Sequence, residues 1–204
     1  MQAEFLFDVA SPNAYLAHRV LPSVMKRTGV TFRYTPVLLG GIFKATNNRS
    51  PMVAFADVPS KLAYEQLELA RFVKKHALPF RMNPHFPVNT LLLMRILTVA
   101  KLEGALSPCV DAAMHHMWEA PKKMDDPEVV RAALAESGLE AERLIARAQE
   151  PAVKSALLES TEDAVARGAF GIPTFFVNGA MFFGKDRLRD VEDEIVRGQA
   201  QAGK

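Results

Sequence analysis

The sequence predicts an α/β fold in which a sheet domain, split into two pieces, encloses an all-helical insertion. Three observations predict it: a β-α-β pattern at the N-terminus, a β-hairpin followed by a helix at the C-terminus, and helical periodicity in between. We expect the sheet domain over residues 1–37 and 168–204, and the helical insertion over residues 38–167. Each piece supplies two strands, so the two must pair to complete a sheet.

The N-terminal piece begins with a short apolar segment, residues 4–9, which predicts a buried strand. Ser11 is suited to cap the following helix, with Pro12 at its first position. A basic last turn followed by Gly29 ends that helix. Residues 30–34 then alternate as a second strand does. A crossover of this kind makes the two strands parallel neighbours.

The C-terminal piece has a different pattern. Apolar runs at residues 175–177 and 181–183 flank Asn178-Gly179, and Asn-Gly between such runs is the strongest short-range hairpin signal. Residues 186–197 carry apolar side chains at helical spacing and predict a closing helix.

The middle of the chain is periodic with helical spacing and is broken at Gly or Pro. We expect no repeat and no low-complexity segment in it. The predicted helices cover residues 61–76, 89–103, 108–119, 126–136, 140–149 and 151–167.

Composition excludes several classes of protein. The chain has 204 residues, 49% of them hydrophobic and 24% charged, with a net charge of +2, which is close to the globular average and excludes disorder. The interspersed charges form no basic stripe for nucleic acid. A single cysteine excludes an intramolecular disulfide and a thiolate metal cluster, and the five histidines show no metal-ligand spacing, so we expect no metal.

The chain shows no targeting or membrane signal. Its first residues lack the basic start and apolar run of a secretory signal, and no apolar stretch reaches the ~20 residues that span a bilayer. We therefore expect a cytoplasmic protein that does not associate with a membrane.

Two short motifs connect the two pieces of the sheet domain, whose arrangement resembles the thioredoxin fold. Ser11-Pro12-Asn13-Ala14 occupies the strand-to-helix junction where redox members of that fold carry Cys-Pro-x-Cys. Gly171-Ile172-Pro173-Thr174 occupies the place of the fold's cis-proline, just before the hairpin. Because neither redox cysteine is present, a disulfide oxidoreductase is excluded.

Longer stretches are similar to one family. Residues 7–17 (FDVASPNAYLA), 170–177 (FGIPTFFV) and 181–188 (MFFGKDRL) resemble 2-hydroxychromene-2-carboxylate isomerases, close relatives of kappa-class glutathione transferases within the DsbA-like group. Residues 58–61 and 82–89 resemble the same group. The resemblance covers nearly the whole chain. It implies a thioredoxin-like fold of the DsbA and kappa transferase type with an inserted helical domain, and a homodimer.

The resemblance also implies that glutathione brings the working thiol. Ser11 would donate a hydrogen bond from its hydroxyl group to the glutathione sulfur, and the positive end of the helix would favour the thiolate. Ile172, before Pro173, would pair its backbone with the cysteinyl residue. The other implied glutathione contacts are Lys185 and Asp186, for the γ-glutamyl end, and Lys61, for the glycine end.

For the second substrate, the family binds with a lysine and an asparagine in the loop after the second strand, where this chain has Lys44 and Asn48. We expect Asn13, Asn83 and His85 to line the rest of the pocket. A cation there suits the carboxylate of an aromatic hydroxy- or oxo-acid. The implied activity is interconversion of 2-hydroxychromene-2-carboxylate and trans-o-hydroxybenzylidenepyruvate, with glutathione regenerated.

Other interpretations stay open. Family members commonly carry an aromatic residue where this chain has Asn13, which leaves room for a kappa-like glutathione transferase or peroxidase acting on other electrophiles. A non-catalytic thioredoxin-fold module that binds peptides at its cis-proline edge is a third possibility. Ser11 and Asp186 are each also ordinary helix-capping residues.

Overall fold

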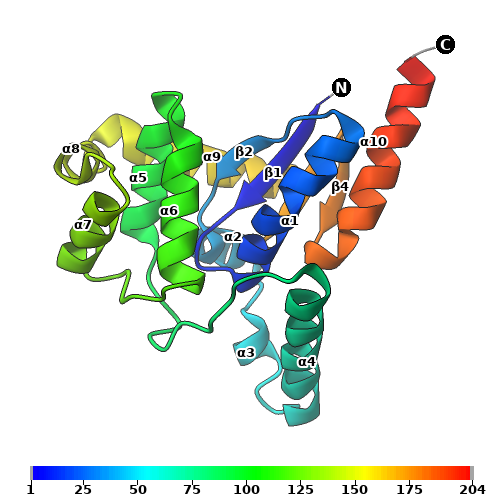
Figure 1. Ribbon diagram of the computed structural model, residues 1–204, viewed down its shortest axis with the longest axis horizontal. Coiled ribbons are helices and arrows are strands. Elements are labelled where there is room, and N and C mark those ends of the chain that lie inside the picture. Colours follow the sequence, from blue (N-terminus) through cyan, green and yellow to red (C-terminus); the bar gives the residue numbers. More distant parts are fainter. Residues whose placement is uncertain (1, 203–204) are drawn as a thin grey trace.

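The computed structural model describes residues 2–202. Its elements form a small sheet and many helices (Figure 1). In chain order they are β1 (Ala3–Phe7), α1 (Pro12–Thr28), β2 (Arg33–Pro36), α2 (Leu39–Thr46), α3 (Pro51–Ala54), α4 (Pro59–His76), α5 (Leu91–Leu102), α6 (Leu106–Trp118), α7 (Pro127–Glu136), α8 (Ala141–Arg147), α9 (Pro151–Ala166), β3 (Thr174–Val177), β4 (Ala180–Phe183), the 3₁₀ turn η1 (Lys185–Arg187) and α10 (Leu188–Ala202).

The sheet confirms the predicted thioredoxin-like arrangement. Its strand order is β2-β1-β3-β4, so the N-terminal and C-terminal pieces meet where β1 pairs with β3. β1 runs parallel to β2 and antiparallel to β3, and β3 and β4 form the hairpin. Asn178 (φ 49°) and Gly179 (φ 88°) make the two-residue turn of that hairpin, as expected for Asn-Gly.

Helices cover both faces of this sheet. α1 and α10 pack on each other, while α9 and α5 reach β2 and α2 packs on α9. An aromatic layer fills the sheet side below α1: the Phe5 ring lies 5.2 Å from that of Phe175 and 4.9 Å from that of Tyr34, centroid to centroid. All four strands precede α2 or follow α9, so the helices between lie in one uninterrupted segment.

The second strand lies later in the chain than residues 30–34. β2 covers residues 33–36 because it takes its register from β1, with Phe7 opposite Pro36 and the Val37 N–H donating to the Phe7 carbonyl at 3.1 Å. β2 is an edge strand, where a proline is tolerated because one side of the strand needs no hydrogen bond. The alternating apolar pattern of residues 30–34 does not determine how β2 aligns with β1.

The segment after β2 is helical, although we expected a loop there. α2 contains Gly40 and Gly41, which lower helix propensity. Packing explains the helix: a Cβ at Gly41 would lie 3.1 Å from Cγ2 of Thr161 on α9, so glycine permits the close approach. Asn47 ends α2 in the left-handed conformation (φ 53°). Lys44 therefore lies in the last turn of a helix.

Helices α3 and α4 project from the sheet domain (Figure 1). Neither helix has a buried residue. No helix within residues 2–202 is long and apolar enough to cross a membrane.

Candidate functional site

Ser11 caps α1 as predicted. Its Oγ accepts a hydrogen bond from the Ala14 N–H at 3.2 Å and donates one to the carbonyl oxygen of Ile172 at 3.2 Å. The residue is 5% exposed. One short side chain thus joins the start of α1 to a segment 161 positions later in the chain.

The Ile172–Pro173 peptide bond is cis, as the motif predicts. The Gly184 N–H donates to the Pro173 carbonyl at 2.9 Å, which ties this segment to the end of the hairpin. Gly171 leaves room for the Phe183 ring, which would have to move for a Cβ because its nearest atom would lie 2.8 Å away. The backbone opposite Ser11 is therefore fixed from both sides.

Two backbone N–H groups beside Ser11 remain free. Pro12 has no N–H, Ser11 takes that of Ala14, and the N–H groups of Asn13 and Ile172 have no acceptor within residues 2–202. Free N–H groups at a helix start attract anions, and a free N–H next to a cis-proline suits an extended peptide. This arrangement has the chemistry needed to hold a thiolate that belongs to a peptide.

Asp8 lies directly before this turn. Its backbone carbonyl accepts the Ser11 N–H at 3.1 Å, and its side chain is buried, with 1% of the residue exposed. Burial raises the pKa of the Asp8 carboxyl, although three hydrogen bonds oppose the rise. Sequence reasoning passed over Asp8; the available signal was an acidic residue at the end of an apolar strand, two positions before a backbone N–H that it binds.

Lys185 and Asp186 follow the hairpin in η1. The Lys185 side chain is 5% exposed, and its Nζ lies 3.1 Å from both carboxylate oxygens of Asp186. That ammonium also lies 5.3 Å from the ring centroid of Phe72 on α4. The Asp186 side chain is 59% exposed and open to a further cation. Gly184, and not Asp186, occupies the capping position of this turn.

The residues predicted to meet the second substrate and the glycine end are more scattered. Asn48 is exposed and donates from Nδ2 to the Phe170 carbonyl at 2.8 Å, which brings it next to the cis-proline segment. Lys44 is exposed on α2. Lys61 lies in the first turn of α4, where its Nζ is 3.7 Å from the ring centroid of Phe55. Figure 1 shows that end of α4 far from the sheet.

Asn83 and His85 differ in exposure. Asn83 is 2% exposed, and its amide donates to the carbonyls of Met117 and Lys122, at 3.2 and 2.9 Å, while its Oδ1 accepts the His85 N–H at 2.9 Å. These hydrogen bonds hold the loop and leave no polar group of the Asn83 side chain for a ligand. His85 itself is exposed. Of this pair, His85 alone has a side chain available to a ligand.

Cys109 is the chain's one thiol, and it lies on α6 with 3% of the residue exposed. Burial raises the pKa of this thiol, so it stays protonated and unreactive.

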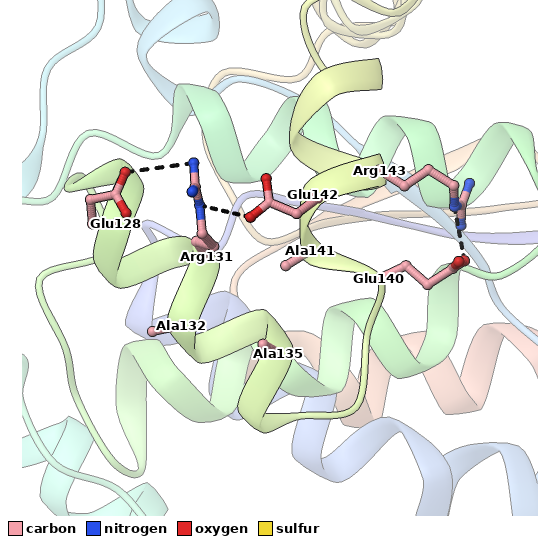
Figure 2. A pocket seen from close by; sticks show the side chains of 8 residues that line it. All are labelled: Glu128, Arg131, Ala132, Ala135, Glu140, Ala141, Glu142 and Arg143. Carbon is pink, nitrogen blue, oxygen red and sulfur yellow. Dashed lines mark hydrogen bonds and ion pairs between the residues drawn. The ribbon is translucent and has the colours of Figure 1, made fainter.

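A hollow of about 590 Å³ lies elsewhere, between α7 and α8 (Figure 2). Its charged side chains already pair with one another: Arg131 lies 3.2 Å from Glu142, and Arg143 lies 2.8 Å from Glu140. Alanines make up the rest of the lining. Its glutamates are held in ion pairs with these arginines, so we place the candidate site at Ser11.

Known proteins resemble this chain in sequence and in fold. The model of the DSBA-like thioredoxin domain matches residues 2–196. A 2-hydroxychromene-2-carboxylate isomerase from Sphingobium xenophagum is 28% identical over 193 residues, 95% of this chain and 97% of the relative. Human glutathione S-transferase kappa 1 is 29% identical over 203 residues, 91% of this chain and 86% of the relative.

A solved structure of a 2-hydroxychromene-2-carboxylate isomerase superimposes with a TM-score of 0.86 at 24% identity, covering 100% of this chain and 98% of that one. Relatives that are isomerases and glutathione transferases indicate that this protein is an enzyme. The chain therefore belongs to the DSBA-like thioredoxin domain family, among relatives named 2-hydroxychromene-2-carboxylate isomerase and kappa glutathione transferase.

Proposed function

We propose that the protein is a glutathione-dependent isomerase that interconverts 2-hydroxychromene-2-carboxylate and trans-o-hydroxybenzylidenepyruvate. One observation carries the proposal: Ser11 caps a helix and faces the carbonyl of the cis-proline segment, in a site without a cysteine. The names of the relatives support it.

The hydrogen bond between Ser11 and Ile172 can be replaced by hydrogen bonds to glutathione when glutathione binds. In the free protein the Ser11 hydroxyl donates to Ile172. A glutathione thiolate takes over that donor, and the released Ile172 carbonyl accepts the N–H of the cysteinyl residue. The free Ile172 N–H pairs with the cysteinyl carbonyl. No donor or acceptor is lost, so the charge-assisted bond to sulfur is a net gain.

Thiolate formation lowers the cost of the first chemical step. The Ser11 hydroxyl and the free Asn13 N–H at the positive end of α1 favour the anion over the thiol. The thiolate adds to the ring alkene carbon next to the arene, the double bond shifts to the 2-hydroxy carbon, and the ring C–O bond breaks. This leaves an enol and a phenolate, and the phenolate takes up the enol proton when glutathione leaves. Rotation about the bond that has become single and elimination of glutathione then give the trans product. The carbon–sulfur bond that forms is the one that breaks, so no electrons are transferred.

The second substrate is held by exposed groups. Asn48 lies beside the cis-proline segment because it donates a hydrogen bond to the Phe170 carbonyl, so it is placed to contact the second substrate. Lys44, one turn earlier, supplies a cation for the substrate carboxylate, and Asn13 and His85 line the remaining walls. Asn83 holds the His85 loop and is left out of direct contact.

At the other end of glutathione, the exposed carboxylate of Asp186 binds the γ-glutamyl ammonium, and Lys185 orients that carboxylate from its buried position. The family resemblance assigns Lys61 to the glycine end, and this contact requires the first turn of α4 to approach the sheet (Figure 1). Because the reaction depends on reduced glutathione, we place the enzyme in the cytoplasm.

The first test is Ser11→Ala. We expect kcat/KM to fall about 10- to 100-fold and the pKa of the bound glutathione thiol to rise, because a charge-assisted hydrogen bond is lost. Loss of the cap also costs about 1 kcal/mol of stability. Asp126→Ala is the matched control, since Asp126 caps α7 by accepting the Glu128 N–H at 3.0 Å away from the site.

The measurement is an ultraviolet assay with hydroxychromene carboxylate, with and without glutathione. Turnover without glutathione contradicts the proposal, and so does the absence of any turnover. If calorimetry also detects no glutathione binding, the non-catalytic peptide-binding module is the better description.

A kappa-like glutathione transferase is the second candidate, and Asn13 favours it. An aromatic residue at this position would stack on an aromatic substrate, and asparagine does not. Consumption of glutathione with chlorodinitrobenzene, in the absence of isomerisation, identifies this activity.

A further inference from the structure

The buried Asp8 carboxylate gathers three hydrogen bonds from separate parts of the chain. Its Oδ1 accepts the Ala10 N–H at 2.9 Å and the Thr90 hydroxyl at 2.8 Å. Its Oδ2 accepts the Leu39 N–H at 2.8 Å. These partners are neutral, so the buried carboxyl group is satisfied by hydrogen bonds and not by an ion pair.

Each of the three donors lies at one end of a segment that forms a wall of the proposed site. Ala10 belongs to the turn that leads into α1 and its cap. Leu39 is the first residue of α2, which leads to the substrate-side residues 44–48. Thr90 directly precedes α5 and follows the loop that carries His85. The starts of α1 and α2 and the end of the His85 loop therefore meet on one side chain.

We propose that Asp8 is a positioning residue that sets the spacing between the thiol side of the site, at Ser11, and the second-substrate side, on α2 and the His85 loop. This proposal rests on the proposed function. Asp8 touches neither glutathione nor substrate in it, and acts through the backbone that carries the residues that do. The two oxygens have separate tasks: Oδ1 holds the α1 turn and Thr90, and Oδ2 holds α2.

Asp8→Asn separates those tasks. An asparagine keeps Oδ1 for Ala10 and Thr90 but turns its NH₂ group toward the Leu39 N–H, so two donors face each other. We expect amide hydrogen exchange at Leu39 to speed up about 10-fold beyond any change in global stability, while Ala10 stays protected. The Ile42 N–H, which donates to the Leu38 carbonyl at 2.9 Å, is the reference within α2.

The same variant makes a kinetic prediction. Because α2 carries substrate-side residues, we expect KM for the second substrate to rise about 10-fold, with kcat and the pKa of the bound glutathione thiol unchanged. Glu4→Gln is the matched control, since Glu4 is also a buried carboxylate but lies near the start of β1, at the opposite end of the strand from Asp8 and Ser11. It should leave KM unchanged.

Wild-type exchange at Leu39 in Asp8→Asn overturns the proposal, and so does a KM change no greater than that of Glu4→Gln. If Asp8→Asn does not fold, Thr90→Val removes one donor, and an unchanged KM in that variant overturns it instead. Wild-type protein that fails to bind glutathione contradicts the proposed function, whereas the exchange pattern tests the Asp8 geometry without glutathione.

Discussion

The two ends of β1 each bury a carboxylate, and the surroundings of the two differ. Near the start of the strand, Glu4 accepts the Thr35 hydroxyl at 2.6 Å and pairs with Arg33 and Arg167 at 3.0 and 2.8 Å. Beyond its other end, Asp8 has neutral donors alone. A carboxylate with cationic partners ties the sheet to the end of α9, while one with neutral donors fixes backbone directions around Ser11.

The largest expected effect breaks the Glu4 end. Glu4→Gln leaves the Arg167 guanidinium without its buried counter-charge, so we expect the free energy of unfolding to fall by about 2 kcal/mol, less than for a fully buried pair because Arg33 and Arg167 are partly exposed. Urea denaturation measures it. A loss of activity in the folded variant would contradict the division of tasks between the two carboxylates.

A smaller effect tests the Asp8 end. The Trp118 indole donates from Nε1 to the carbonyl of Val9, in the turn between Asp8 and Ser11, at 2.9 Å, and both groups are buried. Trp118→Phe should cost about 1–2 kcal/mol because it leaves a buried carbonyl unpaired and a small cavity. Unlike Glu4→Gln, it should also lower kcat/KM about threefold, measured in the ultraviolet assay. An unchanged kcat/KM would show that the turn keeps its position without the Trp118 hydrogen bond.

The smallest effect is the dependence of stability on pH, which has opposite signs at the two ends. At Glu4, burial raises the pKa, but the Thr35 hydroxyl and the Arg167 guanidinium outweigh it, and the pKa lies below its usual value of 4.5. Its stabilisation is therefore present above pH 4.5 and is lost as the pH falls through the folded pKa.

For Asp8 the pKa is raised by burial, so the folded protein binds that proton more tightly than the unfolded chain does. Its contribution is greatest below the usual value of 3.8 and declines as the pH rises through the folded pKa. Unfolding titrations of Glu4→Gln and Asp8→Asn against the wild type should show these opposite slopes. Equal slopes would remove the electrostatic distinction between the two ends.

Local sequence signals predicted the parts of the fold that neighbouring residues determine. Ser11-Pro12 set the start of α1, Gly29 its end, and Asn178-Gly179 the hairpin turn. The bounds of β2 and the loop expected in place of α2 were wrong in the sequence analysis, because contacts with β1 and α9, far away in the chain, determine them.

The same division holds for the candidate site. Ser11 and Ile172-Pro173 were found from motifs, and the structure brings them together. Asp8 was missed because its partners Leu39 and Thr90 lie 31 and 82 positions away, and no periodicity or motif encodes such a convergence. The substrate-side residues stay a prediction, since exposed side chains leave few contacts that reveal their role.

The burial of Cys109 has a consequence for how the enzyme ages in an oxidising cell. An enzyme whose own cysteine performs the chemistry can be inactivated when that sulfur is oxidised beyond repair. Here the single thiol of the chain is shielded and protonated, and Ser11 has no comparable chemistry. Under the proposed function, the reacting thiol belongs to glutathione, so oxidation of that thiol removes the cosubstrate and leaves the catalytic Ser11 unchanged, and activity returns when reduced glutathione does.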